Sequence, residues 1–182
     1  LDTLTGGSGN DALFGGNDAD LLNGGLGNDQ LYGDAGLDTI STGGGEDTVY
    51  GGGDADSILG EDGNDQLYGD AGMDTLAGGL GNDQLFGGTE ADSLSGDGGN
   101  DLLDGGSNRD TISGGDGDDT IYAGTEDDTV YGGAGTDSIF GGDGRDFILY
   151  GEGNDTIFAG SGDDFVDDLE GMRLAGRNLV YA

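Results

Sequence analysis

Apolar side chains recur along the chain with a strict period of nine residues. With Gly6 as position one, eighteen complete units run to Asp167 without insertion or deletion, and position eight is Leu, Ile or Val in every unit, from Leu13 to Val166. One aliphatic side chain between two outward-facing neighbours is the alternation of a short β-strand. Each unit is therefore predicted to form a three-residue strand at positions seven to nine, with position eight pointing inward.

A second column with the same period consists of aspartate. Position six is Asp in all eighteen units, while position four is mostly Gly, which supplies the positive φ that tight turns require. A solvated acidic surface needs no fixed register, so this column predicts a bound partner. The members are Asp11, Asp20, Asp29, Asp38, Asp47, Asp56, Asp65, Asp74, Asp83, Asp92, Asp101, Asp110, Asp119, Asp128, Asp137, Asp146, Asp155 and Asp164.

Composition indicates that this partner is a cation. The formal net charge is -35, four Arg are the only basic residues, and His and Cys are absent. Such a charge excludes nucleic acid and an anionic membrane surface as partners. No signal peptide and no apolar run long enough to insert into a membrane is present. Zinc would favour His or Cys ligands, which leaves a cation that prefers oxygen.

The repeated unit G-G-x-G-x-D-x-U-x, in which U is aliphatic, resembles the calcium-binding nonapeptide of the RTX (repeats-in-toxin) hemolysin-type family. The resemblance covers 162 of the 182 residues. It implies an all-β fold, a parallel β-roll (right-handed β-solenoid) of about nine coils with two repeats each. In that fold three-residue strands alternate with six-residue turns, and calcium lies between turns of neighbouring coils. It also implies a secreted bacterial protein exported by a type I system.

The expected calcium ligands are the position-six carboxylates together with backbone carbonyls of the turns. A coil of eighteen residues places Asp11, Asp29 and Asp47 above one another at ~4.8 Å, where bare carboxylates repel. Ca²⁺ accepts a loose shell of six or more oxygens, whereas Mg²⁺ demands octahedral geometry. Nine turns on each of two edges leave at most about 16 gaps for Ca²⁺. The carbonyls expected to contribute include those of Gly7, Gly9, Gly25, Gly27, Gly79 and Gly81.

Folding itself is predicted to depend on this metal. One aliphatic side chain per nine residues makes a thin core, and ordering a Gly-rich chain costs on the order of 1 kcal/mol or more per residue in backbone entropy. Charge repulsion opposes the compact state as well. Metal binding then supplies the folding free energy.

The two edges of the predicted roll differ in sequence. Odd-numbered units always have Gly at position four and usually Asn at position five, as at Asn10. Five even-numbered units replace the Gly at position four, and Leu37 and Met73 stand at position five of two others. The functional interpretation of this difference is a second class of calcium site or a contact edge. The alternative is that it results from duplication of a 36-residue block. The even-unit substitutions at position four are Asp18, Asp54, Glu90, Asn108 and Glu126.

The two outer faces differ as well. Position nine of the odd units forms an aromatic ladder with one interruption, and position seven of the even units is mostly Thr or Ser. The ladder is either an internal stabiliser or a docking surface, and the hydroxyl face is similar to that of ice-binding solenoids. The ladder positions are Phe14, Tyr32, Tyr50, Tyr68, Phe86, Asp104, Tyr122, Phe140 and Phe158.

Three segments are expected from the register. Residues 1–5 fit the end of a preceding unit and predict a continuation upstream, residues 6–167 form the calcium-binding roll, and residues 168–182 form a C-terminal cap. Without His, Cys or Lys, the chain lacks the usual nucleophile pairs and Schiff-base residue, and a thin roll is expected to offer no pocket. No enzyme is expected in this segment, although an upstream catalytic domain is left open.

The most consistent function is that of an extracellular, calcium-folded structural module of a secreted or cell-surface bacterial protein, with self-association into a layer or filament as an adhesive or structural role. The alternative is a folding and export module of a secreted enzyme or toxin. An ice- or carbohydrate-binding surface is the third hypothesis.

Overall fold

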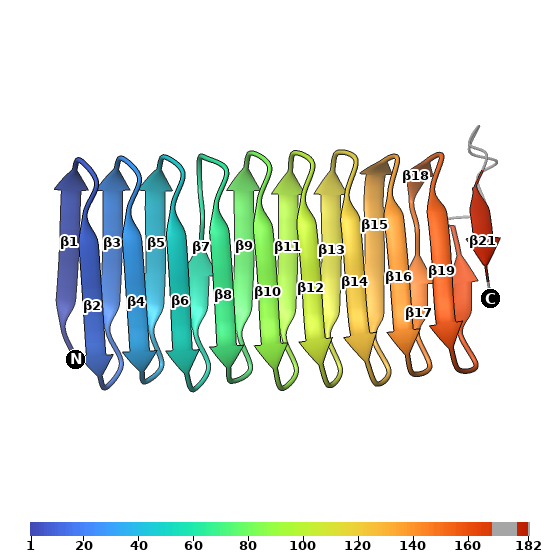
Figure 1. Ribbon diagram of the computed structural model, residues 1–182, viewed down its shortest axis with the longest axis horizontal. Coiled ribbons are helices and arrows are strands. Elements are labelled where there is room, and N and C mark those ends of the chain that lie inside the picture. Colours follow the sequence, from blue (N-terminus) through green and yellow to red (C-terminus); the bar gives the residue numbers. More distant parts are fainter. Residues whose placement is uncertain (169–177, 182) are drawn as a thin grey trace.

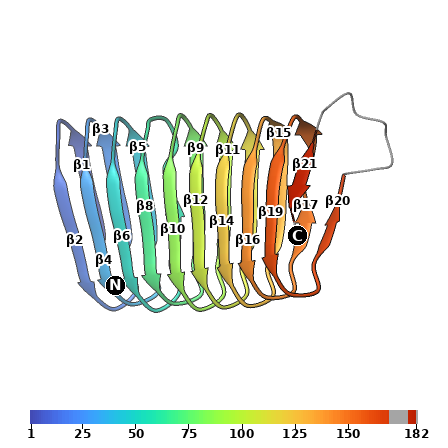
Figure 2. The same cartoon turned by 45° about the vertical axis from the view of Figure 1, so that its right-hand side comes forward.

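The computed structural model describes residues 1–168 and 178–181, and it consists of two parallel β-sheets that face each other along a rod (Figures 1 and 2). The first sheet contains β1 (Thr3–Ser8), β3 (Leu21–Leu26), β5 (Thr39–Gly44), β7 (Ser57–Leu59), β9 (Thr75–Leu80), β11 (Ser93–Gly98), β13 (Thr111–Asp116), β15 (Thr129–Gly135), β17 (Phe147–Leu149), β18 (Glu152–Gly153) and β20 (Phe165–Asp167). The second sheet contains β2 (Ala12–Asn17), β4 (Gln30–Ala35), β6 (Thr48–Gly53), β8 (Gln66–Ala71), β10 (Gln84–Thr89), β12 (Leu102–Ser107), β14 (Thr120–Thr125), β16 (Ser138–Asp143), β19 (Thr156–Ser161) and β21 (Leu179–Tyr181).

The register confirms a parallel β-solenoid of about nine coils with two repeats per coil. Strands of one sheet run up and those of the other run down in Figure 1. From β1 to β20 each strand pairs with residues 18 positions away, so that Leu31 lies opposite Val49. Turns at positions four to six of the odd units form the odd edge, at the top of Figure 1, and those of the even units form the even edge. The described residues contain no helix that could span a membrane.

The predicted strand length is wrong. Most strands have six residues, because positions one to three of the next unit continue the ladder, and only positions four to six turn. In the β1–β3 pair, for example, Gly7 lies opposite Gly25 in the same register as Leu4 opposite Leu22. These glycine-rich positions have no apolar side chains that would predict a strand. Their backbone groups nevertheless pair between coils in the same way as those of the aliphatic positions.

The core is a single file of side chains in each sheet. Position-eight residues from Leu13 to Ile157 are at most 6% exposed, and positions seven and nine on either side are exposed or half-buried. The predicted inward and outward assignment is therefore confirmed. A core one side chain wide buries little apolar surface for the length of chain that it orders.

On the odd edge, glycine at position four of an inner coil is favoured by space as well as by backbone conformation. At Gly45 φ is +142°, and a Cβ would lie 2.2 Å from the carbonyl oxygen of Gly27 in the previous coil. The neighbouring Gly44 is an internal control, because the nearest atom to a Cβ there, Leu26 Cδ2, would be 3.6 Å away.

Replacing Gly45 with Ala should therefore destabilise the calcium-saturated roll by about 2 kcal/mol or more. The matched Gly44→Ala change should stay within about 0.5 kcal/mol of the parent. Thermal unfolding in saturating calcium measures both variants. Equal transition temperatures for the two would contradict the close contact between turns.

The last described strand lies in the segment predicted as a cap. Residues 169–177 and 182 of that segment lie outside the described residues. Strand β21 pairs in parallel with β19, and Tyr181 stacks on Phe158 with ring centroids 4.7 Å apart. The second sheet therefore gains one more rung at this end.

Candidate metal centre

The position-six aspartates form two buried columns, one along each edge of the rod. From Asp20 to Asp155 they are at most 4% exposed, and Asp11 and Asp164 at the column ends are half-buried. Position six lies two residues before the core aliphatic, so its side chain points inward where the turn meets the strand. The two columns predicted from the sequence are thus present, and their side chains face the interior of the roll.

One oxygen of each carboxylate is used by the backbone of the previous coil. The N–H of Asp47 donates to Asp65 Oδ1 at 2.8 Å, and the N–H of Asp65 donates to Asp83 Oδ1 at 2.8 Å. The same bond recurs along both columns, so each aspartate links two coils through its side chain.

The other carboxylate oxygen has no partner. The Oδ2 atoms of seventeen column residues, from Asp11 to Asp155, are buried and accept no hydrogen bond. A Cβ built on the position-one glycine of the same unit would lie close to this oxygen, 2.5 Å for Gly24 and Asp29 Oδ2. Burying an ionised carboxylate without compensation is costly, so each of these oxygens requires either a proton or a cation.

Turn carbonyls supply further unpaired oxygens. Gly9, Gly27 and Gly81, which were expected to contribute, have φ of +111°, +118° and +133°, and a Cβ on Gly27 would lie 2.3 Å from the Gly9 oxygen. Among the described residues, no position-four carbonyl outside a strand accepts a backbone hydrogen bond. These oxygens are directed along the column toward the next turn.

Position-two carbonyls, expected at Gly7, Gly25 and Gly79, are placed differently. The residues that carry them also have a positive φ, but these carbonyls lie within or beside the strands. Two carbonyls at this position accept sheet hydrogen bonds, Gly43 from the N–H of Asp62 at 3.0 Å and Glu61 from the N–H of Leu80 at 2.7 Å. The position-four carbonyl oxygens are therefore more available to coordinate a cation than the position-two oxygens are.

This donor set fits calcium. Within the described part of the chain no three acidic side chains converge on one point, so a site must combine carboxylate with carbonyl oxygens. Such a mixed, oxygen-only set suits Ca²⁺, which accepts irregular geometry and many ligands. The Asp Oδ2 atoms and the position-four carbonyls are the groups that would hold it.

Burial raises the pKa of many column carboxyls. It raises the pKa to about 7 for Asp56, Asp65 and Asp110, with the neighbouring column carboxylates adding to the rise and a backbone hydrogen bond opposing it. The same direction and value hold for Asp92, Asp101, Asp128 and Asp137.

A pH dependence follows for the chain in EDTA. An unfolded Asp has a pKa of about 3.9, so between about pH 4 and pH 7 the folded chain binds more protons than the unfolded one. Stability without calcium should therefore be greatest near pH 4 and fall as the pH rises through about 7. In calcium the stability of the folded chain should instead rise with pH, because protons compete with calcium for the same carboxylate oxygens. Circular dichroism between pH 4.5 and pH 8 in EDTA and in calcium measures this; β signal in EDTA that grows with pH would contradict it.

The odd and even edges differ in how their turns are linked. On the odd edge an Asn or Asp at position five caps the position-five N–H of the next coil, as Asn82 Oδ1 does for Asn100 at 2.7 Å. On the even edge this bond is found once among the described residues, from the N–H of Arg145 to Asp127 Oδ1 at 3.0 Å.

Five even-edge residues replace glycine at position four and have a positive φ that is smaller than the +134° of Gly36 and the +140° of Gly72 at the same position. Their φ values are +76° at Asp18, +75° at Asp54, Glu90 and Asn108, and +80° at Glu126. The Glu90 carboxylate accepts from the N–H of Gly72 at 3.2 Å and from the Thr89 hydroxyl at 2.6 Å. Residues other than glycine seldom adopt a positive φ, and the fold nonetheless holds these five there.

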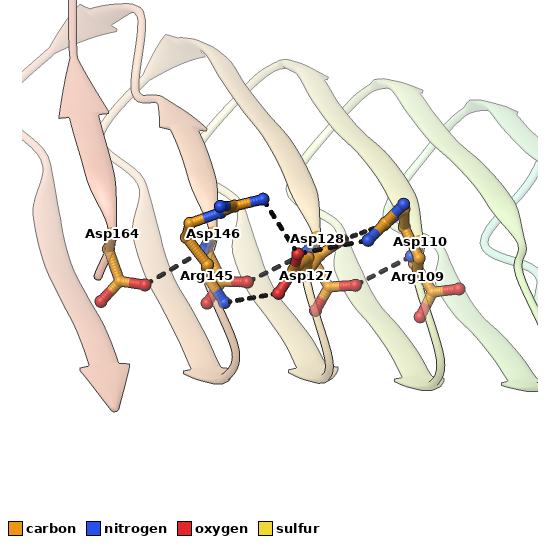
Figure 3. A network of polar contacts seen from close by, with 7 residues as sticks. All are labelled: Arg109, Asp110, Asp127, Asp128, Arg145, Asp146 and Asp164. Carbon is orange, nitrogen blue, oxygen red and sulfur yellow. Dashed lines mark hydrogen bonds and ion pairs between the residues drawn. The ribbon is translucent and has the colours of Figure 1, made fainter. Parts of the chain in front are cut away.

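Sequence reasoning missed an arginine network on the even edge (Figure 3). Arg109 and Arg145 both contact Asp127 Oδ2, at 3.2 and 3.3 Å, from the coils on either side. All three residues occupy position five of successive even units, a spacing that was visible in the sequence. With Phe147 and Phe165 they line a shallow, open groove of about 420 Å³.

A second missed residue is Asn178. Its Oδ1 accepts from the N–H of Asp155 at 2.8 Å, the bond that the next column Asp makes elsewhere. Asn178 to Tyr181 repeat the order of polar residue, strand residue, aliphatic and aromatic found at positions six to nine. The amide of Asn178 thus accepts the hydrogen bond that a column carboxylate accepts in the other coils, but it brings no negative charge.

Comparison with known proteins agrees with this geometry. The family model of the RTX calcium-binding nonapeptide repeat (4 copies) matches residues 2–31, 24–58, 32–67, 50–85, 77–112, 113–148 and 151–167. No curated protein matches the chain. Because the family matches extend over nearly all the coils that carry the aspartate columns, the chain belongs to the RTX calcium-binding nonapeptide repeat family.

Proposed function

We propose that this chain is an extracellular structural module that folds when calcium binds between its turns. The observation that carries the proposal is the set of seventeen buried, unpaired Asp Oδ2 atoms. A cation beside them removes both the burial cost and the repulsion between neighbouring coils. The position-six aspartates, with the position-four carbonyls such as those of Gly9, Gly27 and Gly81, are the proposed ligands.

The chain's own residues set up this dependence. The aspartate side chains bridge coils through Oδ1, the glycine turns bring carbonyl oxygens beside the next coil, and the thin core contributes too little burial to hold the rod alone. Calcium, when bound, supplies positive charge between adjacent turns. Folding and metal binding then become one process.

Secretion is consistent with such coupling. In a cytosol with little free calcium the chain stays unfolded and can be exported, and in calcium-rich surroundings it folds. The role as a structural or surface module is preferred here, because the described coils present no group of side chains arranged for catalysis. A folding and export module of a secreted enzyme or toxin would depend on the same coupling of folding to calcium binding. The sequence upstream of the roll in the full protein would distinguish the two roles.

Sedimentation velocity over a calcium titration tests this function. The sedimentation coefficient should rise as an expanded coil becomes a compact rod, with a midpoint between cytosolic and extracellular calcium levels. An unchanged coefficient from EDTA to millimolar calcium would rule the proposal out. A folding midpoint below the cytosolic calcium concentration would still support the metal site but would contradict the proposed link between folding and secretion.

The aromatic ladder lies on the outer face of the second sheet. From Phe14 to Phe86 five rings stack face to face, with centroids 4.8–5.3 Å apart and planes within 9° of each other. The faces of Tyr32, Tyr50 and Tyr68 are covered by their neighbours, and among the described residues the end rings Phe14 and Phe86 each have one face without a stacked ring. Sugars stack on aromatic faces, so this arrangement favours internal stabilisation or protein contact over a carbohydrate platform.

If rods associate laterally, we expect the ladder to mediate the contact. Changing Tyr32, Tyr50 and Tyr68 to Ser should leave folding in calcium intact and abolish self-association, since the calcium turns are untouched. Sedimentation equilibrium of parent and triple variant in calcium measures this. A triple variant that still assembles shows that the ladder only stabilises the sheet, and a parent that stays monomeric at high concentration removes assembly altogether.

A further inference from the structure

The aromatic ladder is interrupted by one carboxylate. In the register of the second sheet, Asp104 lies between Phe86 and Tyr122. Among the described residues, Phe86 stacks only on Tyr68 and Tyr122 only on Phe140, at 4.9 and 4.8 Å between centroids. Each of these two rings therefore has one face directed at Asp104 and covered by no other ring.

The space between these two faces matches one missing ring. Two strand spacings separate the rungs of Phe86 and Tyr122 by about 10 Å. An aspartate side chain is shorter than a phenylalanine, so it fills the floor of this gap and leaves the outer part open. Tyr122 is 42% exposed and Phe86 is half-buried, so both rings of the gap are in contact with solvent.

The surroundings of Asp104 are apolar. Its neighbours on the same face of β12 are Leu102 and Gly106, and its neighbours across the sheet are the two rings. Burial raises the pKa of the Asp104 carboxyl, with a backbone hydrogen bond from Gly106 opposing the rise. A calcium ion needs six or more oxygens, which one carboxylate between two rings does not provide.

We propose that Phe86, Asp104 and Tyr122 form a slot that binds one guanidinium group, presented by an arginine side chain of a partner protein. A flat cation between the rings would lie about 5 Å from each face, within the ~6 Å range of cation–π attraction. The planar guanidinium can also donate two hydrogen bonds to the carboxylate at the floor. A lysine ammonium is compact and strongly hydrated, and it fits this geometry less well.

The arginine of this interaction comes from outside the described chain. Arg109 and Arg145 lie on the even edge, where both are paired with Asp127. The slot instead lies on the outer face of the second sheet, where β12 runs between β10 and β14. A partner with an exposed arginine could reach it without disturbing the calcium turns.

Nuclear magnetic resonance titration of the calcium-saturated chain with N-acetyl-arginine amide tests the slot. We expect saturable shifts at Phe86, Asp104 and Tyr122, with weaker binding of the matching lysine amide. Asp104→Asn should weaken binding about ten-fold or more, since a charge-assisted pair is lost. Asp104→Tyr, which completes the ladder, should abolish binding.

Asp70→Asn is the matched control, because it removes one negative charge at an exposed site of the same sheet and leaves the slot intact. Its affinity for the probe should stay within about two-fold of the parent. Binding that survives Asp104→Tyr, or equal affinities for the arginine and lysine probes, would show only general attraction to an acidic chain and would overturn the proposal. Absence of any saturable shift would overturn it as well.

Discussion

Chelation of calcium should convert the chain from β structure to coil, and millimolar calcium should restore the β signal. The core is one aliphatic side chain wide, the net charge is -35, and seventeen buried carboxylate oxygens lack partners. Each property disfavours the compact state when no cation is bound. Far-UV circular dichroism at pH 8 in EDTA and in calcium measures the conversion, because protons no longer neutralise the column carboxyls at this pH. Magnesium at the same concentration should restore little of the signal, because it accepts this irregular oxygen set poorly.

Two controls separate specific binding from charge screening. Sodium chloride at about 0.5 M screens charges beyond a few ångströms but offers no divalent ion for the turns. It should therefore leave the chain in EDTA largely unfolded. A β spectrum that persists after thorough chelation would contradict calcium-dependent folding, and one restored by sodium chloride alone would show that repulsion is the whole effect.

Neutralising one aspartate in the middle of a column should weaken calcium binding at two gaps at once. Asp65 is 1% exposed and lies between Asp47 and Asp83, to which it is linked by hydrogen bonds at both ends. Asp65→Asn retains an oxygen for the Asp47 N–H but removes the charge. The number of bound calcium ions should fall by one or two, and the calcium midpoint of folding should rise several-fold.

Asp65→Ala separates the two roles of this side chain. It removes the calcium ligand and also leaves the buried N–H of Asp47 without an acceptor, which costs about 1–3 kcal/mol beyond the Asn variant. Asn178, which accepts from the N–H of Asp155 in the same way, shows that an amide suffices for the backbone role. Equal stability of the Asn and Ala variants would contradict the coil-to-coil bond.

The same substitution on the other edge tests whether the edges bind calcium alike. Asp56 is buried like Asp65, but its turn has Asp54 at position four and Ala55 at position five, without the amide ladder of the odd edge. We expect Asp56→Asn to lower calcium binding and cooperativity less than Asp65→Asn does. Isothermal titration calorimetry compares the two, and equal losses would argue against any difference between the edges.

The register of this fold could be predicted from the sequence because its signal is repeated in every unit. Leu31 and Val49 are both at position eight, and a coil of two units places them side by side, as the structure does. Strand length could not be predicted in this way. Gly7 and Gly25 belong to strands through their backbone groups alone, and hydrophobic periodicity carries no information about such positions.

The stacking of the aspartates into two columns could be predicted from the sequence, but their hydrogen bonds could not. The repeated Asp at position six indicated the columns and the proposed ligands, while the bond from Asp47 N–H to Asp65 Oδ1 appears only when coils are stacked at their actual spacing. The contacts of Arg109 and Arg145 with Asp127 likewise depend on which long side chains reach across one coil. Such choices follow from three-dimensional proximity and not from the nine-residue pattern.

Counting the calcium ions bound to the folded chain tests the central claim most directly. Equilibrium dialysis against radioactive calcium, with total protein determined by amino-acid analysis, gives the number of ions per chain at saturation. If calcium occupies the gaps between turns on both edges, the count should lie between about 8, one edge filled, and about 16, both edges filled. A count of two or fewer ions in the fully folded chain would contradict calcium binding along the aspartate columns.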